Sequence, residues 1–291
     1  MNKSAIAITG FGLVLPKSSS NHDAQNQTVP ELIPRKLRRF STRSIPTAVA
    51  ACHQAVESCG LDEKTLCEKV ALYTAQSGYQ HPDFDDFADA LKGWDRHVEP
   101  SLLATLWQSR QVNPFLITKA LSNNLIGIIS QIWRLKNDGV AFIRDQAGSA
   151  AALDEAYFQL SSGYAEVAMV VMSGCDEDCY TAVAEQRPLP INTEHTGAAV
   201  LILESEAHAK RRGANVQAWI NSFSSNSQEN TPWLDGAMFR EREGLEWGGI
   251  VMAITQSLQH VHSEQYQGHW SVEADYGNKR TARAILRRDT E

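Results

Sequence analysis

The segment Val140-Ala141-Phe142-Ile143-Arg144-Asp145-Gln146-Ala147-Gly148-Ser149 is a short apolar run that leads through a turn into a run of small residues. Residues 140–143 have strand character, and residues 150–160 combine strong helix propensity with apolar residues spaced three and four apart. A side chain in such a turn lies at a helix N-terminus, where a cysteine would have a depressed pKa and react as the thiolate. Gln146 occupies this place, and its amide neither ionises nor acts as a nucleophile. The segment therefore predicts the surroundings of a nucleophile without the nucleophile.

Predicted strands and helices alternate along the rest of the chain, which implies a parallel sheet with crossover helices on its faces. Residues 16–34 are rich in Ser, Asn, Gln and Pro and are predicted to form a loop. Strands are predicted over residues 5–15, 70–75, 140–143, 167–172, 198–204 and 216–222, and helices over 46–60, 116–135 and parts of 83–111. Beyond these we predict a polar linker (224–231), an amphipathic helix (245–262), a strand (270–274) and a last strand or tail (281–288).

Several short motifs over residues 5–214 resemble, in the same order, those of the β-ketoacyl synthases of fatty-acid and polyketide assembly. They are an opening strand with a glycine turn (5–14), Asn113-Pro114-Phe115, Asn123, Gln146, Glu155-Ala156-Tyr157 with Gly163, and the segments 197–204 and 206–214. In this resemblance Gln146 falls on the nucleophilic cysteine of the synthases.

A glutamine in place of that cysteine, followed by Ala-Gly, resembles a chain-length factor, the catalytically silent partner of a ketosynthase in type II polyketide systems. The short chain resembles in particular the chain-length factors of aryl polyene pigment pathways. The resemblance implies an α/β, thiolase-like layered fold with a truncated second half: a ketosynthase-like half over residues 1–222 and a reduced remnant over 223–291 that packs on it. Because so short a remnant cannot cover both faces of a second full sheet, we expect apolar surface to remain there.

The C-terminal half departs from the synthase pattern. The synthases have two histidines, in His-Gly-Thr and Gly-His contexts, that assist decarboxylation and condensation, and neither context is matched. Gly268-His269 is a bare dipeptide that we expect in a loop, and the Phe-Gly-Phe-Gly-Gly loop of the synthases is absent. The resemblance therefore implies no catalytic residue in this chain.

The composition is that of an ordinary globular protein able to bury a sizeable core, with 43% hydrophobic and 21% charged residues among 291. A net charge of -7 and a pI near 5.7 argue against a nucleic-acid partner, which favours a basic surface. If an acidic carrier protein binds this chain, we expect it to bind at basic surface residues. Two runs are candidates, Arg35-Lys36-Leu37-Arg38-Arg39 and Lys210-Arg211-Arg212, although both also fit an ordinary solvated surface.

The five cysteines indicate a reducing compartment rather than a disulfide framework. Cys52 and Cys59 are two helical turns apart and are expected to pack on one helix face. Cys175 and Cys179 flank three acidic residues, but their spacing fits no zinc pattern, so we expect no metal, and no cofactor is implied. No signal peptide and no apolar run of about 20 residues is found, so we expect a cytoplasmic protein without a membrane span.

Three functions are compatible with these observations. The first is a chain-length factor, paired with a ketosynthase subunit and meeting the acyl carrier protein through that complex. The second is a glutamine-type decarboxylase of malonyl-carrier protein, in which the Gln146 amide would donate to the thioester oxygen. Loading ketosynthases of that type keep the histidines, which are not found here. The third is a stand-alone binding or scaffold protein. Purification that tests for an obligate partner separates the first from the others.

A chain-length factor would act through the wall of the acyl-chain tunnel, where bulky side chains end the cavity and small ones extend it. Leu116 is the leading wall candidate, and Trp94 and Trp107 are further ones, although each also fits an ordinary core position. The resemblance also implies a partner interface. In this family the strand before the nucleophile pairs across the dimer axis, and here it consists of Val140, Ala141, Phe142 and Ile143.

Overall fold

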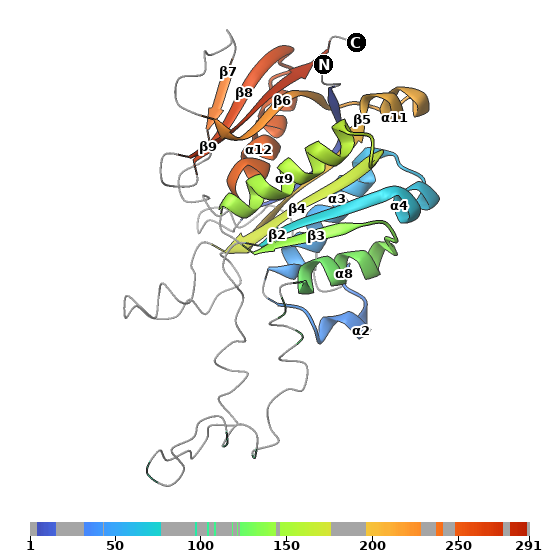
Figure 1. The fold of residues 1–291 in the computed structure, drawn as a ribbon, viewed down its shortest axis with the longest axis vertical. Helices are drawn as coiled ribbons and strands as arrows, with labels where there is room; N and C mark the ends of the chain where they lie inside the picture. Colours follow the sequence, from blue (N-terminus) through green and yellow to red (C-terminus); the bar gives the residue numbers. More distant parts are fainter. Residues whose placement is uncertain are drawn as a thin grey trace.

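A computed structural model describes residues 5–15, 32–42, 44–76, 123–143, 146–175, 196–227, 237–240, 248–275 and 280–289, together with the single positions 97, 104, 108, 118 and 121. The strands are β1 (Ile6–Val14), β2 (Val70–Gln76), β3 (Gly139–Ile143), β4 (Val167–Cys175), β5 (Thr196–Ser205), β6 (Ala218–Ser227), β7 (Ala237–Arg240), β8 (Gly268–Asp275) and β9 (Thr281–Arg288). The helices are α2 (Arg35–Arg38), α3 (Ile45–Cys59), α4 (Glu63–Lys69), α8 (Asn124–Trp133), α9 (Gln146–Ser161), α11 (Glu206–Arg212) and α12 (Gly249–Ser263) (Figure 1).

The described strands form one mixed sheet in the order β3-β2-β4-β5-β1-β6-β9-β8-β7. Pairing is parallel where β2 meets β3 and β4 and where β7 meets β8. It is antiparallel at the other junctions. The prediction of a parallel sheet is therefore wrong for most neighbouring strands. Parallel pairing needs a crossover connection, whereas β8 and β9 are consecutive and separated by only a few residues, which permits direct antiparallel pairing.

The sheet contains the same arrangement twice. In the first group, β1 pairs with β5, β5 with β4, and β4 runs parallel to β2. In the second group, β6 pairs with β9, β9 with β8, and β8 runs parallel to β7. Among the described residues the second group has four strands and the first has five, which agrees with the predicted thiolase-like layered fold with a truncated second half. Ile6 opposite Ile220 and Ala7 opposite Trp219 join the two groups through β1 and β6.

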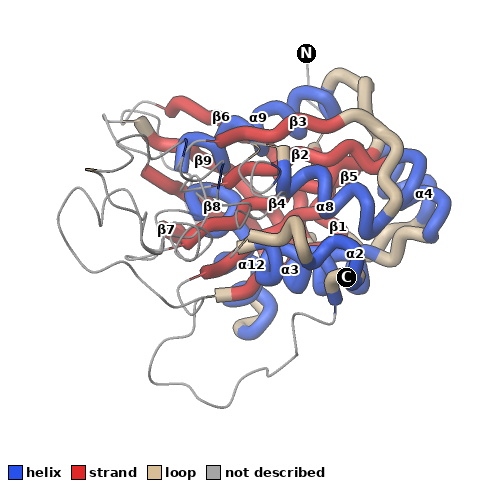
Figure 2. The backbone as a smooth tube through the Cα atoms, turned by 90° about the horizontal axis from the view of Figure 1, so that it is seen from below, coloured by secondary structure: helices blue, strands red, loops and turns tan. Residues whose placement is uncertain are grey.

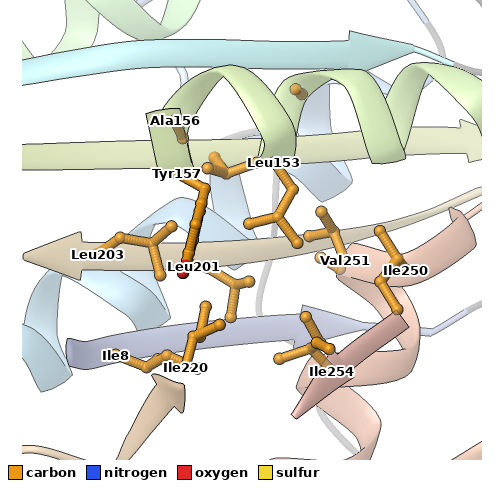
Figure 3. Packing of buried hydrophobic residues seen from close by; sticks show 14 of the residues in the cluster. Ile8, Leu153, Ala156, Tyr157, Leu201, Leu203, Ile220, Ile250, Val251 and Ile254 are labelled. Carbon is orange, nitrogen blue, oxygen red and sulfur yellow. The ribbon is translucent and has the colours of Figure 1, made fainter. Parts of the chain in front are cut away.

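The larger core lies on the face of the sheet that α9 and α12 cover (Figures 1 and 2). Alternate residues of the strands point to this face, as the period of two in a strand requires. Figure 3 shows Leu153 and Tyr157 of α9 with Leu201 of β5, and Ile250 and Ile254 of α12 packing in the same cluster. On the opposite face of the first group, α3, α4 and α8 cover a second core that includes Val49, Leu66, Val70, Ile129 and Val171.

Gly10 and Gly12 lie where α3 packs against β1. A Cβ atom at Gly12 would overlap the carbonyl oxygen of Ala51, and one at Gly10 would overlap that of Ala55. The two glycines are therefore inside the strand, and they allow the helix backbone to approach it. Cys52 and Cys59 are both buried on α3, as predicted from their spacing.

The face of β8 that points away from the large core is polar. In β8, Trp270, Val272 and Ala274 point into the large core, so the alternating residues Ser271 and Glu273 point to the other face. There the Glu273 carboxylate accepts from Arg283 Nε at 2.6 Å across the β8–β9 pair. Ser271, Glu273 and Arg283 are themselves buried, so this part of the face is not exposed surface, and the expectation of apolar surface on the remnant stays a prediction.

Most predicted elements are confirmed within a few residues, and several details are corrected. Ser224–Ser227 of the predicted linker belongs to β6, so the expected boundary after residue 222 lies inside a strand. Gly268-His269 begins β8 rather than lying in a loop. The short elements α4, α11 and β7 had not been predicted. The predicted helical segments over 83–111 lie outside the described residues except for the single positions 97, 104 and 108, and most of the predicted loop over 16–34 also lies outside.

Candidate functional site

The predicted strand before Gln146 and the predicted helix after it are both present in the backbone. β3 ends at Ile143 and α9 begins at Gln146. Two residues, 144 and 145, separate them and lie outside the described part of the chain, as does the side chain of Gln146. Gln146 is therefore the first helical residue, which is the position in which a cysteine would be activated by the helix N-terminus.

The first turn of α9 contacts the first turn of α12. Ser149 is fully buried, and its Oγ accepts a hydrogen bond from the backbone N–H of Val251 at 3.0 Å. Val251 is the third residue of α12, so its N–H is one of the four amide groups without a partner inside that helix. The run of small residues from Ala147 to Ala152 leaves room for the approach. Ser149 thus caps a helix about one hundred residues away in the sequence.

Two helix N-termini therefore meet at this site, and each has partial positive charge. Such an arrangement stabilises an anion, a thiolate or the oxygen of a tetrahedral intermediate, when a reacting group is present. The glutamine at the head of α9 supplies no titratable group. The first residue of α9 thus lies in electrostatic surroundings that favour an anion, and Gln146 itself is no nucleophile.

The described histidines lie away from this site or serve other contacts. His260 and His262 are in the last turn of α12, about 14 and 17 Å along the helix axis from Val251. His208 bonds the Glu204 carboxylate through Nδ1 at 2.6 Å, and the His53 ring packs on Trp133. The two histidines of α12 therefore lie at the far end of that helix from the contact with α9.

The predicted interface strand β3 is an edge strand of the sheet. Its register places Val140 opposite Tyr73 and Phe142 opposite Ala75 of β2, and among the described residues no strand pairs with its other side. Val140 is 40% exposed, and Phe142 packs partly against the large core. β3 contains neither a charged residue nor a proline, the usual protections of an exposed edge.

Beside this edge lies a tyrosine whose ionisation is suppressed. Burial, together with the nearby carboxylates of Glu155 and Asp138, raises the pKa of Tyr73 to about 12. The phenol therefore stays neutral near the edge at physiological pH. Glu155, on α9, and Asp138, just before β3, both come close to it, which shows that α9 passes over the start of the edge strand.

The predicted tunnel residues Leu116, Trp94 and Trp107 lie outside the described residues, as do Asn113-Pro114-Phe115. Cys175 ends β4, and residues 176–179 of the acidic segment are also outside. Within the described residues no group of three or more His, Cys, Asp or Glu side chains could hold a metal ion. No helix in the described ranges is long and apolar enough to cross a membrane.

The two basic runs differ in their surroundings. All three basic residues of 210–212 have carboxylate partners: Lys210 with Glu206, Arg211 with Glu166, and Arg212 with Glu204. On α2, by contrast, Arg35 and Lys36 are exposed, and Arg38 donates to the carbonyl oxygen of Ile33. The α2 segment is thus the better placed of the two for an acidic partner.

Sequence reasoning missed a buried charge network centred on Glu204. Its carboxylate, fully buried, accepts from Thr9, His208 and Arg212. Burial raises the pKa of this carboxyl, but the three hydrogen bonds outweigh it and hold the pKa below its ordinary value. Arg212 also donates to the carbonyl oxygens of Cys59 and Gly60 at the end of α3. The signal for this network in the sequence was the spacing of His208 and Arg212, which follow Glu204 by four and eight residues.

The fold that these elements define is the thiolase-like fold. Solved structures similar to this chain include a chain from the complex of a type II polyketide synthase acyl-carrier protein with its ketosynthase bound to the hexaketide. That match has a TM-score of 0.72 at 15% identity, and it covers 99% of this chain and 100% of the other.

The ishigamide ketosynthase/chain length factor matches with a TM-score of 0.59 at 15% identity, with the same coverage of both chains. A β-ketoacyl synthase from Burkholderia phymatum matches at 0.64 and 14%, again over 99% of this chain and 100% of the other. No protein-family model and no curated protein sequence matches the chain.

Proposed function

We propose that this chain is the non-catalytic chain-length-factor subunit of a ketosynthase heterodimer and shapes the acyl-chain tunnel in polyketide biosynthesis, with an aryl polyene as the product. The observation that carries the proposal is the glutamine at the head of α9, where the thiolase-like fold places a nucleophile. The positions of His260 and His262, at the far end of α12 from the two converging helix N-termini, support it. The similarity to a ketosynthase/chain length factor pair supports it as well.

The partner is a ketosynthase subunit that pairs with the free edge of β3, through Val140, Ala141, Phe142 and Ile143. An unprotected apolar edge favours strand addition, in which backbone hydrogen bonds give affinity and alternate side chains pack in each subunit. An obligate interface of this kind buries more than about 2,000 Å² in total and is apolar at its centre.

The role in chain length rests on Leu116, Trp94 and Trp107, which we propose as wall residues of the tunnel. Replacing Leu116 by tryptophan is expected to shorten the product, and replacing it by alanine to lengthen it, because wall residues act by volume. The acyl carrier protein meets the complex at an exposed basic surface, for which α2 with Arg35 and Lys36 is our candidate. Charge reversal there should weaken carrier binding most at low salt.

The test is co-expression with the ketosynthase of the same pathway, followed by incubation with acyl- and malonyl-carrier protein. The pair should make product, and this chain alone should make none. Val140→Asp places a charge on the exposed edge and should abolish co-purification. Leu15→Asp, at another apolar residue with 37% exposure, is the matched control and should leave the complex intact. Turnover by the isolated chain would overturn the proposal.

A second experiment examines Gln146. If Gln146 has only a structural role, Gln146→Ala should leave the amount of pathway product unchanged. It should lower the free energy of unfolding by about 1–3 kcal/mol, because packing and hydrogen bonds are lost. Loss of product with the complex and the melting temperature unchanged would instead favour a decarboxylase in which the amide takes part.

A further inference from the structure

The first residue of α8, Asn124, joins two segments that are far apart in the sequence. Its side chain is buried, and Nδ2 donates to the carbonyl oxygen of Phe40 at 3.1 Å and to that of Thr118 at 3.0 Å. An asparagine amide nitrogen has two hydrogens, so both are used. The two carbonyl oxygens also fix the orientation of the amide, because an amide oxygen in the place of Nδ2 would face two acceptors.

The other polar atom of this side chain, Oδ1, is buried and has no hydrogen-bond partner among the described residues. A buried acceptor without a partner costs free energy, and an apolar side chain of similar shape would avoid that cost. What the asparagine contributes at this position is therefore the pair of bonds from Nδ2.

Phe40 follows α2 in a segment that has other contacts to the body of the protein. The Phe40 N–H donates to the carbonyl oxygen of Leu37 at 2.9 Å, and Leu37 is buried. Arg38 Nε donates to the carbonyl oxygen of Ile33 at 2.9 Å, and the Phe40 side chain packs against the second core. The α2 segment is thus anchored without Asn124, and the Phe40 carbonyl offers a fixed point.

Thr118 lies in the chain that leads into α8. Its carbonyl oxygen accepts from the Leu121 N–H at 3.4 Å, and the Leu121 carbonyl accepts from the Asn124 N–H at 3.0 Å. These contacts are local, and Leu121 is largely exposed. The bonds from Asn124 Nδ2 connect this turn with the anchored α2 segment. In the sequence, Thr118 follows the proposed wall residue Leu116 by two positions.

We propose that Asn124 is a positioning residue for the wall of the acyl-chain tunnel: it holds Thr118 beside the α2 segment and thereby fixes the place of Leu116. This inference rests on the proposed function, in which Leu116 acts by its volume. A wall residue can select between chain lengths only while its supporting residues hold it in place. Without the two bonds the wall yields, and longer acyl chains are accepted.

The experiment compares Asn124→Ala and Asn124→Leu, each co-expressed with the ketosynthase and supplied with acyl- and malonyl-carrier protein. Leucine has a similar branched shape without donors, so it separates lost hydrogen bonds from lost packing. In both variants the ratio of the normal product to the next longer one should fall about tenfold, because one extra group in an apolar pocket is worth about 10–200-fold in selectivity. Asn123→Ala is the matched control, since Asn123 is exposed and makes no side-chain capping bond. It should leave the ratio unchanged.

Two further measurements distinguish positioning from a general loss of stability. In a Leu116→Ala background, Asn124→Ala should change the product ratio little further, because both changes act through the same part of the wall. The dissociation constant for the acyl carrier protein should stay that of the original pair, since α2, with Arg35 and Lys36, keeps its own contacts.

The outcomes separate this inference from the proposed function. If the original pair makes no product, or if Leu116→Ala and Leu116→Trp leave the product unchanged, the proposed function fails. If the Leu116 variants change chain length and both Asn124 variants keep the normal ratio, only the positioning role is refuted. An equal loss of all products at an unchanged ratio refutes it as well. Asn124→Ser, which keeps one donor, replaces Asn124→Ala if that variant precipitates.

Discussion

Replacing Ser149 by alanine tests the contact that joins the two central helices. The change removes the Ser149 oxygen that accepts from the Val251 N–H, and both residues are fully buried, so water cannot replace it. A buried amide left without a partner costs about 1–3 kcal/mol. For a chain of this size that corresponds to about 2–4 °C in melting temperature for each kcal/mol.

The measurement is urea or thermal unfolding of the purified chain, or of the co-purified pair if the chain alone precipitates. Ser161→Ala is a matched control on the same helix, because the Ser161 hydroxyl is exposed and donates only to the carbonyl oxygen of Phe158 in the preceding turn. It should change the free energy of unfolding by less than about 0.5 kcal/mol. If Ser149→Ala is as stable as Ser161→Ala, the hydroxyl does not cap α12 and the argument for converging helix ends is refuted.

Three further predictions concern the charge networks and the glycines. Arg212→Ala leaves the buried Glu204 carboxylate without its main partner and should cost about 3–5 kcal/mol in urea unfolding, whereas Lys210→Ala, at an exposed pair, should cost less than about 1 kcal/mol. Hydrogen bonds from Lys69 and Arg211 lower the pKa of Glu166 from 4.5 to about 2, so the stability they give is present above pH 4.5 and is lost as the pH falls toward 2. Glu166→Gln should therefore lower the stability above pH 4.5 and make it less dependent on pH between 4.5 and 2. Gly12→Ala should destabilise the chain by about 1–3 kcal/mol, because the new Cβ would overlap Ala51. Gly127→Ala should instead stabilise the chain by about 0.4–1 kcal/mol, because a Cβ there meets no other atom. Thermal unfolding of the two variants measures both changes.

Local sequence patterns predicted the elements well where one physical signal dominates. The apolar run of β2 is buried at every position, and α3 ends at Gly60 in the left-handed conformation that favours glycine. Strand direction was not predictable in this way, because apolar periodicity is the same in parallel and antiparallel strands. α4 escaped notice because seven residues are too few for a clear helical period.

The candidate site could be found only in part. The turn into α9 was visible because it lies within one segment, and the resemblance then gave Gln146 its meaning. The contact between Ser149 and Val251 joins residues 102 positions apart, and no local pattern marks either of them as a partner. The bond from Asn124 to Phe40 could not be predicted either, since these residues are 84 positions apart.

The position of β1 between β5 and β6 has a consequence for biosynthesis. β1 carries Ile6, Ile8 and Leu13 into the cores, yet its neighbours in the sheet are made much later: Thr9 meets Glu204, 195 positions further along the chain. At about 5–20 residues per second, ribosomes reach that point about 10–40 s after making β1. During this interval α3 is the element that can cover the strand, because Gly10 and Gly12 let it approach directly. The central strand of the finished sheet is therefore synthesised early, and its sheet partners β5 and β6 become available only after most of the chain has been made.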